Sequence, residues 1–205
     1  MSLGARLVPT LGVMLVLAAC AARPPPAAGP DAARCLARLD SAGVRYERVD
    51  LATEPAPCGV DTPVRVTLAA AAWNQPGVVS CAFAARLEDF TRAVIEPAAR
   101  ARFGEGVRRI RHLGAYSCRR ENGGSGRWSQ HSRGNAIDIA GFELESGTVV
   151  LVASDWRSRG AKSAFLRDIA RAACERFSAV LTPDSDREHR DHIHLDAGPY
   201  RICGA

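Results

Sequence analysis

The cysteines of this chain restrict its possible folds more than any other feature. Cys20 closes an N-terminal apolar stretch, and six further cysteines stand at positions 35, 58, 81, 118, 174 and 203. An even number of cysteines in a chain bound for an oxidising compartment indicates disulfides, so we expect three. Six cysteines allow fifteen pairings, of which sequence order favours 35 with 58, 81 with 118 and 174 with 203. A zinc ion held by cysteines is the alternative, but the sequence has no CxxC pair to hold one.

The N-terminal residues indicate export. Arg6 precedes an apolar run over residues 11–17, which is too short to span a bilayer and is typical of a signal peptide. Residues 17–20 read Leu-Ala-Ala-Cys and resemble a bacterial lipobox. We therefore expect residues 1–19 to be removed and Cys20 to carry lipid; plain cleavage near an Ala-x-Ala site is the alternative. Ala21 is not the aspartate of inner-membrane retention, which favours an outer-membrane protein facing the periplasm.

The rest of the chain divides into a tether and one domain. Residues 20–32 are rich in proline and alanine, a composition that favours an extended spacer. Residues 33–205 leave room for one hydrophobic core, because chains of this length rarely form two. Apolar residues make up 47% and charged residues 24% of the whole chain, as in ordinary globular proteins.

Periodicity and turn residues predict an α+β fold. Helices are predicted for a short segment capped by Asp31, for 82–103 with a kink or interruption at Pro97 and an end at Gly104, and for 162–177. Strands are predicted at 44–49, 62–68, 107–116, 137–144, 148–152, 180–181 and 193–197. Since most strands fall in the second half and two of them form a hairpin, we expect one domain with a mostly antiparallel sheet flanked by helices.

Four of the five histidines lie in two clusters, with His112 the exception. In the first cluster, His131 precedes Asp138 by seven residues, and Gly134 between them permits a tight turn. A loop imidazole and a strand carboxylate at this spacing can reach the same zinc ion. A lone histidine near an aspartate is more often an ordinary surface or core residue.

The second cluster, residues 188–196, supplies the third ligand. It contains His189, His192 and His194, and in a strand the last two would project from one face. Two histidines and one aspartate that leave an open position are typical of a catalytic zinc site. We therefore predict one Zn²⁺ ion held by His131, Asp138 and His194. A domain held by disulfides alone, without metal, is the alternative.

The charge of the chain gives weaker information about partners. The formal net charge is +5, but no basic run alternates with aromatic residues, so a nucleic-acid surface is not indicated. A mildly basic surface suits an anionic cell-wall polymer.

The two clusters resemble a known group of zinc proteins. The pattern SxHxxGxAxD followed by D-H-x-H is similar to the LAS superfamily, which includes lysostaphin-type peptidases, D-Ala-D-Ala metallopeptidases and the hedgehog N-domain. More closely, residues 116–119, 129–142, 155–156, 165–166, 174–183 and 189–196 resemble the bacterial extensin-like C-terminal domain family. This resemblance covers about residues 33–203 and implies a fold like that of hedgehog and the D-Ala-D-Ala peptidases.

The resemblance also implies roles for individual residues. By position relative to the last histidine, Asp191 matches the general base of the D-Ala-D-Ala peptidases. His192 matches the catalytic histidine of the penicillin-insensitive murein endopeptidase, and His189 matches an outer histidine that can bind the metal in a resting state. Arg119 resembles an arginine that binds a substrate carboxylate, and we expect Ser129 to contact the substrate as well. Residues 116–119 read Tyr-Ser-Cys-Arg where those peptidases have Gly-Tyr-Arg-Ser.

These patterns together predict a zinc metallohydrolase that cleaves amide bonds in the peptides of peptidoglycan. It would be a D-Ala-D-Ala carboxypeptidase or a murein endopeptidase. The rival hypothesis is a lipoprotein that keeps the zinc fold but only binds or organises the cell wall.

Overall fold

The computed structural model describes residues 28–51, 54, 58–121 and 126–205. The predicted signal peptide, Cys20 and most of the predicted tether lie outside these residues, so predictions about them remain predictions. Helix α1 (Pro30–Ser41) includes the last three residues of the predicted tether and begins after Gly29 rather than at a cap on Asp31. Within the described residues, none of the helices combines the length and the hydropathy needed to cross a membrane.

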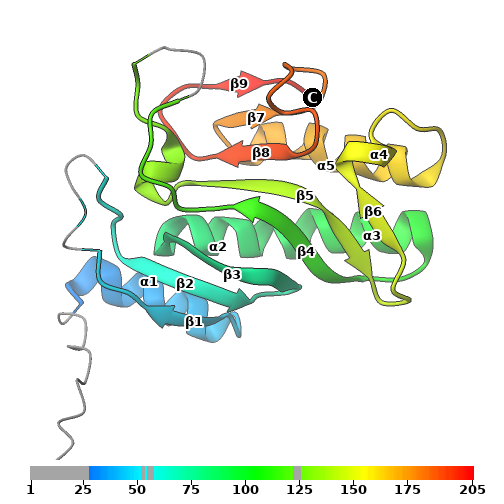
Figure 1. The fold of residues 1–205 in the computed structure, drawn as a ribbon. Coiled ribbons are helices and arrows are strands. Elements are labelled where there is room, and N and C mark those ends of the chain that lie inside the picture. Colours follow the sequence, from blue (N-terminus) through cyan, green and yellow to red (C-terminus); the bar gives the residue numbers. More distant parts are fainter. Residues whose placement is uncertain (1–27, 52–53, 55–57, 122–125) are drawn as a thin grey trace, which may run out of the picture.

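The core of the molecule is a single mixed sheet (Figure 1). The strand order is β1-β2-β3-β4-β5-β8-β7-β9, with β6 paired to β5. All neighbours run antiparallel except β3 with β4 and β7 with β9. The strands are β1 (Arg45–Arg48), β2 (Pro63–Leu68), β3 (Ala72–Ser80), β4 (Val107–Gly114), β5 (Ala136–Leu144), β6 (Val149–Leu151), β7 (Ala179–Leu181), β8 (Ile193–Asp196) and β9 (Ile202–Cys203). The predicted α+β class with a mostly antiparallel sheet is confirmed.

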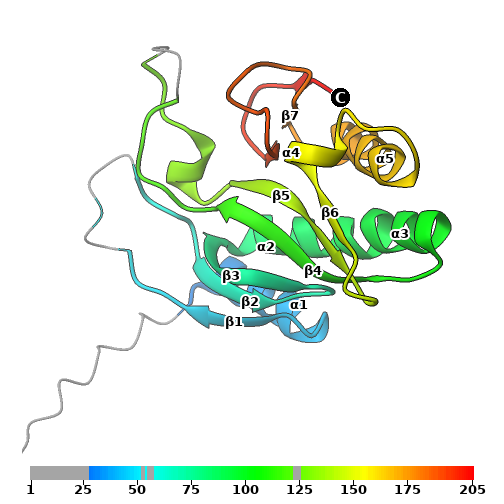
Figure 2. The same cartoon turned by 45° about the vertical axis from the view of Figure 1, so that its right-hand side comes forward.

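The helices lie behind the sheet in the view of Figure 1 and remain on that side in Figure 2. Besides α1 they are α2 (Cys81–Phe90), the π-helical turn η1 (Thr91–Ile95), α3 (Glu96–Phe103) and α5 (Ala161–Arg176). The short helix α4 (Val152–Asp155) directly follows β6 and lies in front of α5 in both views. Ser80 caps α2 by accepting a hydrogen bond from the Phe83 amide at 3.1 Å. Gly104 ends α3 with a φ of 77°, as the sequence predicts.

Of the two expected effects of Pro97, a kink or an interruption, the interruption does not occur. The chain stays helical from α2 to α3, but five residues before Glu96 wind as a π-helix. Because Pro97 has no amide hydrogen, the preceding turn cannot complete its α-helical hydrogen bonds, and a wider turn accommodates the missing donor.

Strands β3 and β9 and the short helix α4 escaped prediction. The middle of β3 contains Pro76 and Gly77, which indicate a turn in an isolated sequence. Its ladder with β2 runs from Gly77 to Ser80 and resumes at Ala72, so the residues between them form an irregular bulge. Pairing with both neighbours therefore holds a segment whose local preference is for a turn.

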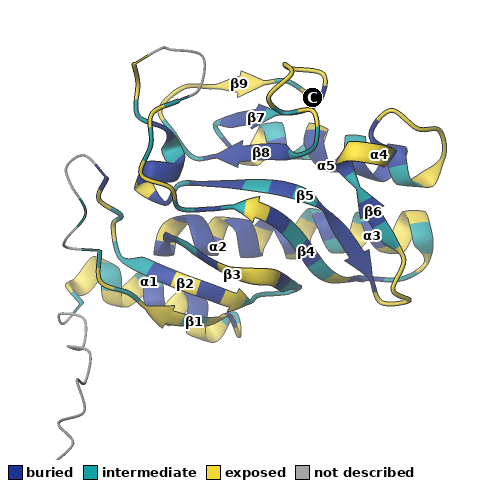
Figure 3. Cartoon of the chain, viewed as in Figure 1, coloured by how far each residue is buried: buried dark blue, intermediate teal, exposed yellow. Residues whose placement is uncertain are grey.

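Buried and more exposed residues alternate along β2 and β4, whereas β5 and β8 are mostly buried, as the colours of Figure 3 show. Phe165 on α5 is fully buried and contacts Phe103 and Phe142, with ring centroids 5.3 and 5.2 Å apart. Phe177, at the end of α5, meets Phe83 and Phe90 of α2 in the same way. These aromatic contacts join α2, α3, α5 and β5 into one core.

Three disulfides form, but two of the three predicted pairings are wrong. Cys174 pairs with Cys203 as expected, whereas Cys35 pairs with Cys81 and Cys58 pairs with Cys118. The entropy of closing a loop depends only weakly on loop length, so nearness in sequence is a poor guide to pairing. The packing of α1 beside α2 decides the first bond instead.

Candidate metal centre

The histidine and aspartate side chains gather on the face of the sheet opposite the helices. On β8, Ile193 and Leu195 point into the core, so His194 and Asp196 point the other way. On β5, the residues on either side of Asp138 are fully buried in the core, which directs its carboxylate to the same open face. The period of two along each strand therefore brings these polar side chains together.

Strand register places two of the predicted ligands directly opposite each other. Asp138 on β5 is the antiparallel partner of His194 on β8. Side chains of such partners project side by side, about 4.5–5.5 Å apart at Cβ. Pairing of β5 with β8 thus brings together two residues that lie 56 positions apart in the sequence.

His131 reaches the same point from the 3-10 helix η3 (Gln130–Arg133). The Ser129 hydroxyl caps this helix by accepting a hydrogen bond from the His131 amide at 3.3 Å. Gly134 ends it with a φ of 64°, and a Cβ there would lie 2.8 Å from the backbone nitrogen of Ser80. The predicted tight turn at Gly134 is confirmed, and only glycine fits both its backbone angle and the space.

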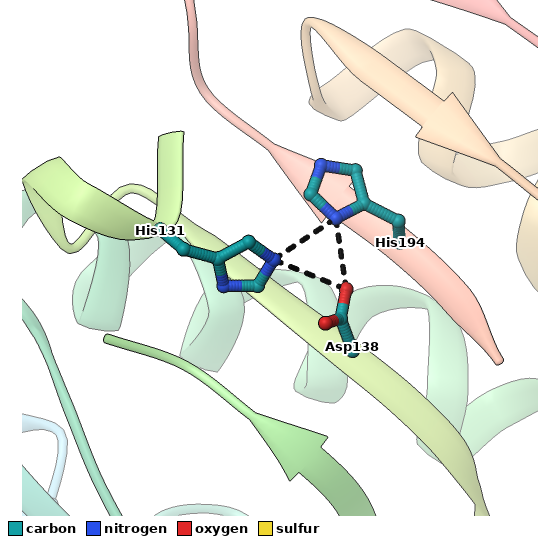
Figure 4. A group of neighbouring side chains, drawn as sticks. All are labelled: His131, Asp138 and His194. Carbon is teal, nitrogen blue, oxygen red and sulfur yellow. Dashed lines mark hydrogen bonds and ion pairs between the residues drawn. The ribbon is translucent and has the colours of Figure 1, made fainter. Parts of the chain in front are cut away.

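The three side chains converge, as Figure 4 shows. The His131 Nε2 atom lies 3.2 Å from Asp138 Oδ1 and 3.3 Å from His194 Nδ1, and the last two atoms are 2.8 Å apart. Among the described residues, they form a group of possible metal ligands whose ligand atoms all lie within 4.8 Å of one another.

The outer nitrogen of each imidazole has its own hydrogen-bond partner. His131 Nδ1 donates to the carbonyl oxygen of Ala115, and His194 Nε2 donates to Asp196 Oδ2 at 3.2 Å. With these protons committed outward, the inner nitrogens would present lone pairs toward the centre once a metal ion displaced their own protons. Partners of this kind orient metal-binding histidines and raise their basicity.

The electrostatics of the group fit a site for a cation. Burial raises the pKa of Asp138, but hydrogen bonds from His131 and His194 outweigh it and hold the pKa far below its usual range. Burial lowers the pKa of His194, yet hydrogen bonds to Asp138 and Asp196 raise it to about 9. The space between the carboxylate and the imidazole therefore favours a positive species, either a proton or a metal ion.

The residues present fit a zinc ion. Ligands bound at 2.0–2.1 Å in tetrahedral geometry lie about 3.3 Å apart, close to the two separations from His131. The shorter distance between Asp138 and His194 is that of a direct hydrogen bond. Two imidazoles and a carboxylate form a common catalytic zinc set.

Two further histidines stand beside the group, each with an aspartate. His192 lies just before β8 rather than in it, with Nε2 3.6 Å from Asp138 Oδ1 and Nδ1 2.9 Å from Asp191 Oδ1. The hydrogen bond from His192 lowers the pKa of Asp191. His189 donates to Asp186 at 2.7 Å, and its ring centroid lies 5.8 Å from that of His194.

A cavity of about 550 Å³ opens over the three side chains. Arg119 and Ser129, the predicted substrate contacts, line it together with His189 and His192. Asp191 is not among its lining residues and contacts the Nδ1 atom of His192. The hydroxyl of Ser129 is already engaged as a helix cap, so substrate contact by Ser129 remains a prediction.

Several residues of the site escaped prediction. Asp196 follows His194 by two residues, and this H-x-D spacing on a strand is a signal that could have found it. The carbonyl of Ala115 leaves no signal in a sequence, because every residue carries one. The cavity wall formed by Arg127, Tyr200 and Ile202 depends on tertiary structure.

Comparisons with known proteins identify the family. The family described as "Extensin-like protein C-terminus" matches residues 33–204, which is nearly the whole domain. Neither a curated protein nor a solved structure matches the chain. The resemblance found in the motifs is thereby confirmed at the level of this family: the chain belongs to the extensin-like C-terminal domain family.

Proposed function

We propose that this protein is a zinc-dependent hydrolase that cleaves amide bonds in peptidoglycan peptides. The observation that carries the proposal is the convergence of His131, Asp138 and His194 beneath an open cavity. Three protein ligands with a fourth position left open are typical of catalytic zinc, whereas structural zinc sites are closed by four. The similarity of the motifs and of the expected fold to D-Ala-D-Ala peptidases and the murein endopeptidase supports cell-wall peptides as substrates.

A zinc ion held by these residues would supply a Lewis acid that polarises a carbonyl group and acidifies water. The protein's own side chains must carry out the proton transfer. The Asp191 carboxylate accepts the Nδ1 proton of His192 at 2.9 Å, which leaves the Nε2 lone pair toward Asp138 and the cavity. His192 is therefore placed to accept a proton at Nε2 and to return it to a leaving amine.

This geometry favours a different division of roles from the one that the resemblance implies. Asp191 accepts from Nδ1 of His192 and does not line the cavity, whereas His192 does, which favours His192 over Asp191 as the group that takes the proton. We infer that His192 is the general base and that Asp191 fixes its ring orientation and tautomer. His189, held by Asp186, remains an auxiliary residue.

Two substitutions separate these roles. His192→Ala should lower kcat by about 10² to 10⁴ fold, the usual contribution of general-base catalysis. Asp191→Asn should cost less and should shift the pH profile of kcat, because the imidazole keeps its place but loses its carboxylate partner. Both variants should retain zinc. A larger loss of kcat for Asp191→Asn than for His192→Ala would instead identify Asp191 as the general base.

The function itself is tested with the full mature protein. Wild-type protein should contain one zinc per chain and release soluble fragments from purified peptidoglycan. Asp138→Asn should lose both properties, whereas Asp168→Asn, a matched change on the surface of α5, should lose neither. Metal analysis and mass spectrometry of the released fragments give the answer. Zinc-loaded protein that binds peptidoglycan but releases nothing would support the wall-binding scaffold instead.

We further infer that lipid on Cys20 holds the domain at the outer membrane of the cell envelope, facing the periplasm. The three disulfides support passage through an oxidising compartment. Replacing Cys20 by alanine should move the protein from the membrane fraction to the soluble fraction. Retention in the membrane fraction would contradict lipid anchoring.

A further inference from the structure

The segment that orients His131 has little regular secondary structure of its own. We call residues 115–121, which follow the end of β4, the arm; residues 115–119 belong to no helix or strand. The Ala115 carbonyl at the start of the arm accepts a hydrogen bond from His131 Nδ1. The Ser117 amide adds a second contact by donating to the carbonyl oxygen of His131 at 3.3 Å. The direction of His131 Nε2 therefore depends on where the arm lies.

The arm is attached to another irregular segment, residues 58–60. Cys118 of the arm forms a disulfide with Cys58, whose side chain is fully buried. The Tyr116 hydroxyl donates to the carbonyl oxygen of Cys58 at 3.1 Å. Burial and the nearby Glu54 carboxylate raise the pKa of Tyr116, so this hydroxyl keeps its proton. A covalent bond and a hydrogen bond thus join the arm to residues 58–60.

The same segment also borders the helix that carries His131. The side chain of Val60 lies so close to Gly134 that a Cβ at Gly134 would come within 2.7 Å of it. Gly134 is the residue that ends η3. Residues 58–60 therefore connect the arm, which holds the His131 ring, with the turn that ends the helix of His131.

We propose that the Cys58–Cys118 disulfide positions His131, so that tight zinc binding requires the oxidised chain. With the bond formed, the arm keeps the Ala115 carbonyl against His131 Nδ1, and Nε2 faces Asp138 and His194. With the bond open, the arm gains conformational freedom, and the imidazole loses the partner that fixes its orientation. The inference rests on the proposed function for the identity of the metal, but it does not require turnover.

The bond forms by thiol–disulfide exchange. The thiols of Cys58 and Cys118 give up two protons and two electrons as their S–S bond forms, and a disulfide of an oxidising partner protein accepts them and becomes a dithiol. Cytosolic thiols stay reduced, whereas disulfides form in oxidising compartments. The chain therefore acquires its full zinc affinity only where this disulfide can form.

Two disulfide variants with similar loop lengths test the inference. Cys58→Ser/Cys118→Ser opens a bond with a sequence separation of 60, and the control Cys35→Ser/Cys81→Ser opens one with a separation of 46, between α1 and α2. Each bond joins a buried cysteine to a more exposed one. The entropic stabilisation by a disulfide changes only with the logarithm of loop length, so both variants should lose similar thermal stability.

Zinc affinity should separate the two variants, because only one of them frees the arm. Competition with a chromophoric chelator measures the affinity of the full mature protein. Opening Cys58–Cys118 should weaken zinc binding about 10- to 100-fold, the usual cost of losing a partner of a metal-binding histidine. Opening Cys35–Cys81 should leave it unchanged. In metal-free protein, hydrogen exchange of the Ser117 amide, followed by NMR, should accelerate in the first variant only.

A milder pair of variants covers the case in which the open chain fails to fold. Tyr116→Phe removes the hydrogen bond to Cys58 but keeps the ring and the disulfide. It should weaken zinc binding by up to about tenfold, the equivalent of one neutral hydrogen bond. Tyr46→Phe removes a hydroxyl that donates to Asp40 at 2.8 Å, and this matched control should leave zinc affinity unchanged.

Equal zinc affinities of the two disulfide variants would overturn the proposal. An unfolded Cys58→Ser/Cys118→Ser variant combined with an unchanged affinity of Tyr116→Phe would overturn it as well. A wild-type protein that binds zinc but cleaves no peptidoglycan would remove the hydrolase function and leave the disulfide's role standing. If the wild-type protein binds no zinc, the metal centre falls, and the exchange rate of the Ser117 amide decides whether the disulfide holds the arm against His131.

Discussion

Replacing Asp196 by asparagine should weaken zinc binding without removing any ligand. Asp196 is 9% exposed and accepts two hydrogen bonds, from His194 Nε2 at 3.2 Å and from the Gly198 amide at 2.8 Å. An asparagine side chain has one acceptor oxygen and one NH₂ group. Whichever way it turns, one N–H donor must face another N–H donor, so one of the two bonds is lost.

The size of the loss follows from the bond that breaks. A hydrogen bond to a charged group contributes about 1.5–3 kcal/mol. A loss of about 2 kcal/mol corresponds to roughly 30-fold in affinity, which falls inside the 10- to 100-fold range typical for partners of metal-binding histidines. Asp196 also helps His194 retain the proton that competes with the metal. The loss should therefore be larger above pH 9 than at pH 7.

Competition with a chromophoric zinc chelator measures the affinity directly. Circular dichroism verifies that the variant is folded, and Asp168→Asn is the control for removing one carboxylate elsewhere. A variant whose zinc affinity stays within twofold of wild type at both pH values would refute the argument that Asp196 orients His194. Complete loss of zinc would also refute it, because it would make Asp196 a ligand.

Three further results are expected. Zinc affinity should rise up to about tenfold per pH unit from pH 6 to pH 9 and then level off, because the metal must displace the proton of His194, whose pKa is raised to about 9. Chelator competition across this range measures the affinity, and an affinity that does not change with pH would contradict the prediction. Phe165→Ala should lower the free energy of unfolding by about 3–5 kcal/mol in urea titrations, whereas Leu113→Ala, at a 55% exposed position, should change it by less than about 0.5 kcal/mol. Gly134→Ala should lower both stability and zinc affinity, because its Cβ would collide with Ser80 beside the turn that carries His131; normal zinc affinity would show that η3 adapts.

Prediction from the sequence succeeded where the signal is local. The amphipathic stripe of α5, the strands around Asp138 and His194, and the glycines that end α3 and η3 were all found from residue type and spacing. It failed where distant segments compete with local preference. Strand β3 forms across a Pro-Gly step because β2 and β4 both pair with it, and no window of sequence contains those partners.

The candidate site shows the same division. His131, Asp138 and His194 could be named in advance, since their side-chain chemistry and cluster spacing are written in the chain, and the structure brings them within 4.8 Å of one another. The contact of Asp191 with His192 Nδ1 could not be predicted, because the resemblance supplies residue types and not side-chain directions. The turn just before β8 decides that the Asp191 carboxylate contacts Nδ1 of His192 and does not line the cavity.

The sequence by itself determined the class of fold, the number of disulfides and the side chains able to hold a metal, because periodicity, cysteine count and ligand chemistry are properties of short segments. Only the tertiary structure decided which cysteines join, which strands neighbour one another and which charges line the cavity. Those outcomes depend on contacts between residues far apart in the chain, whose energies appear only once the sheet has set its register.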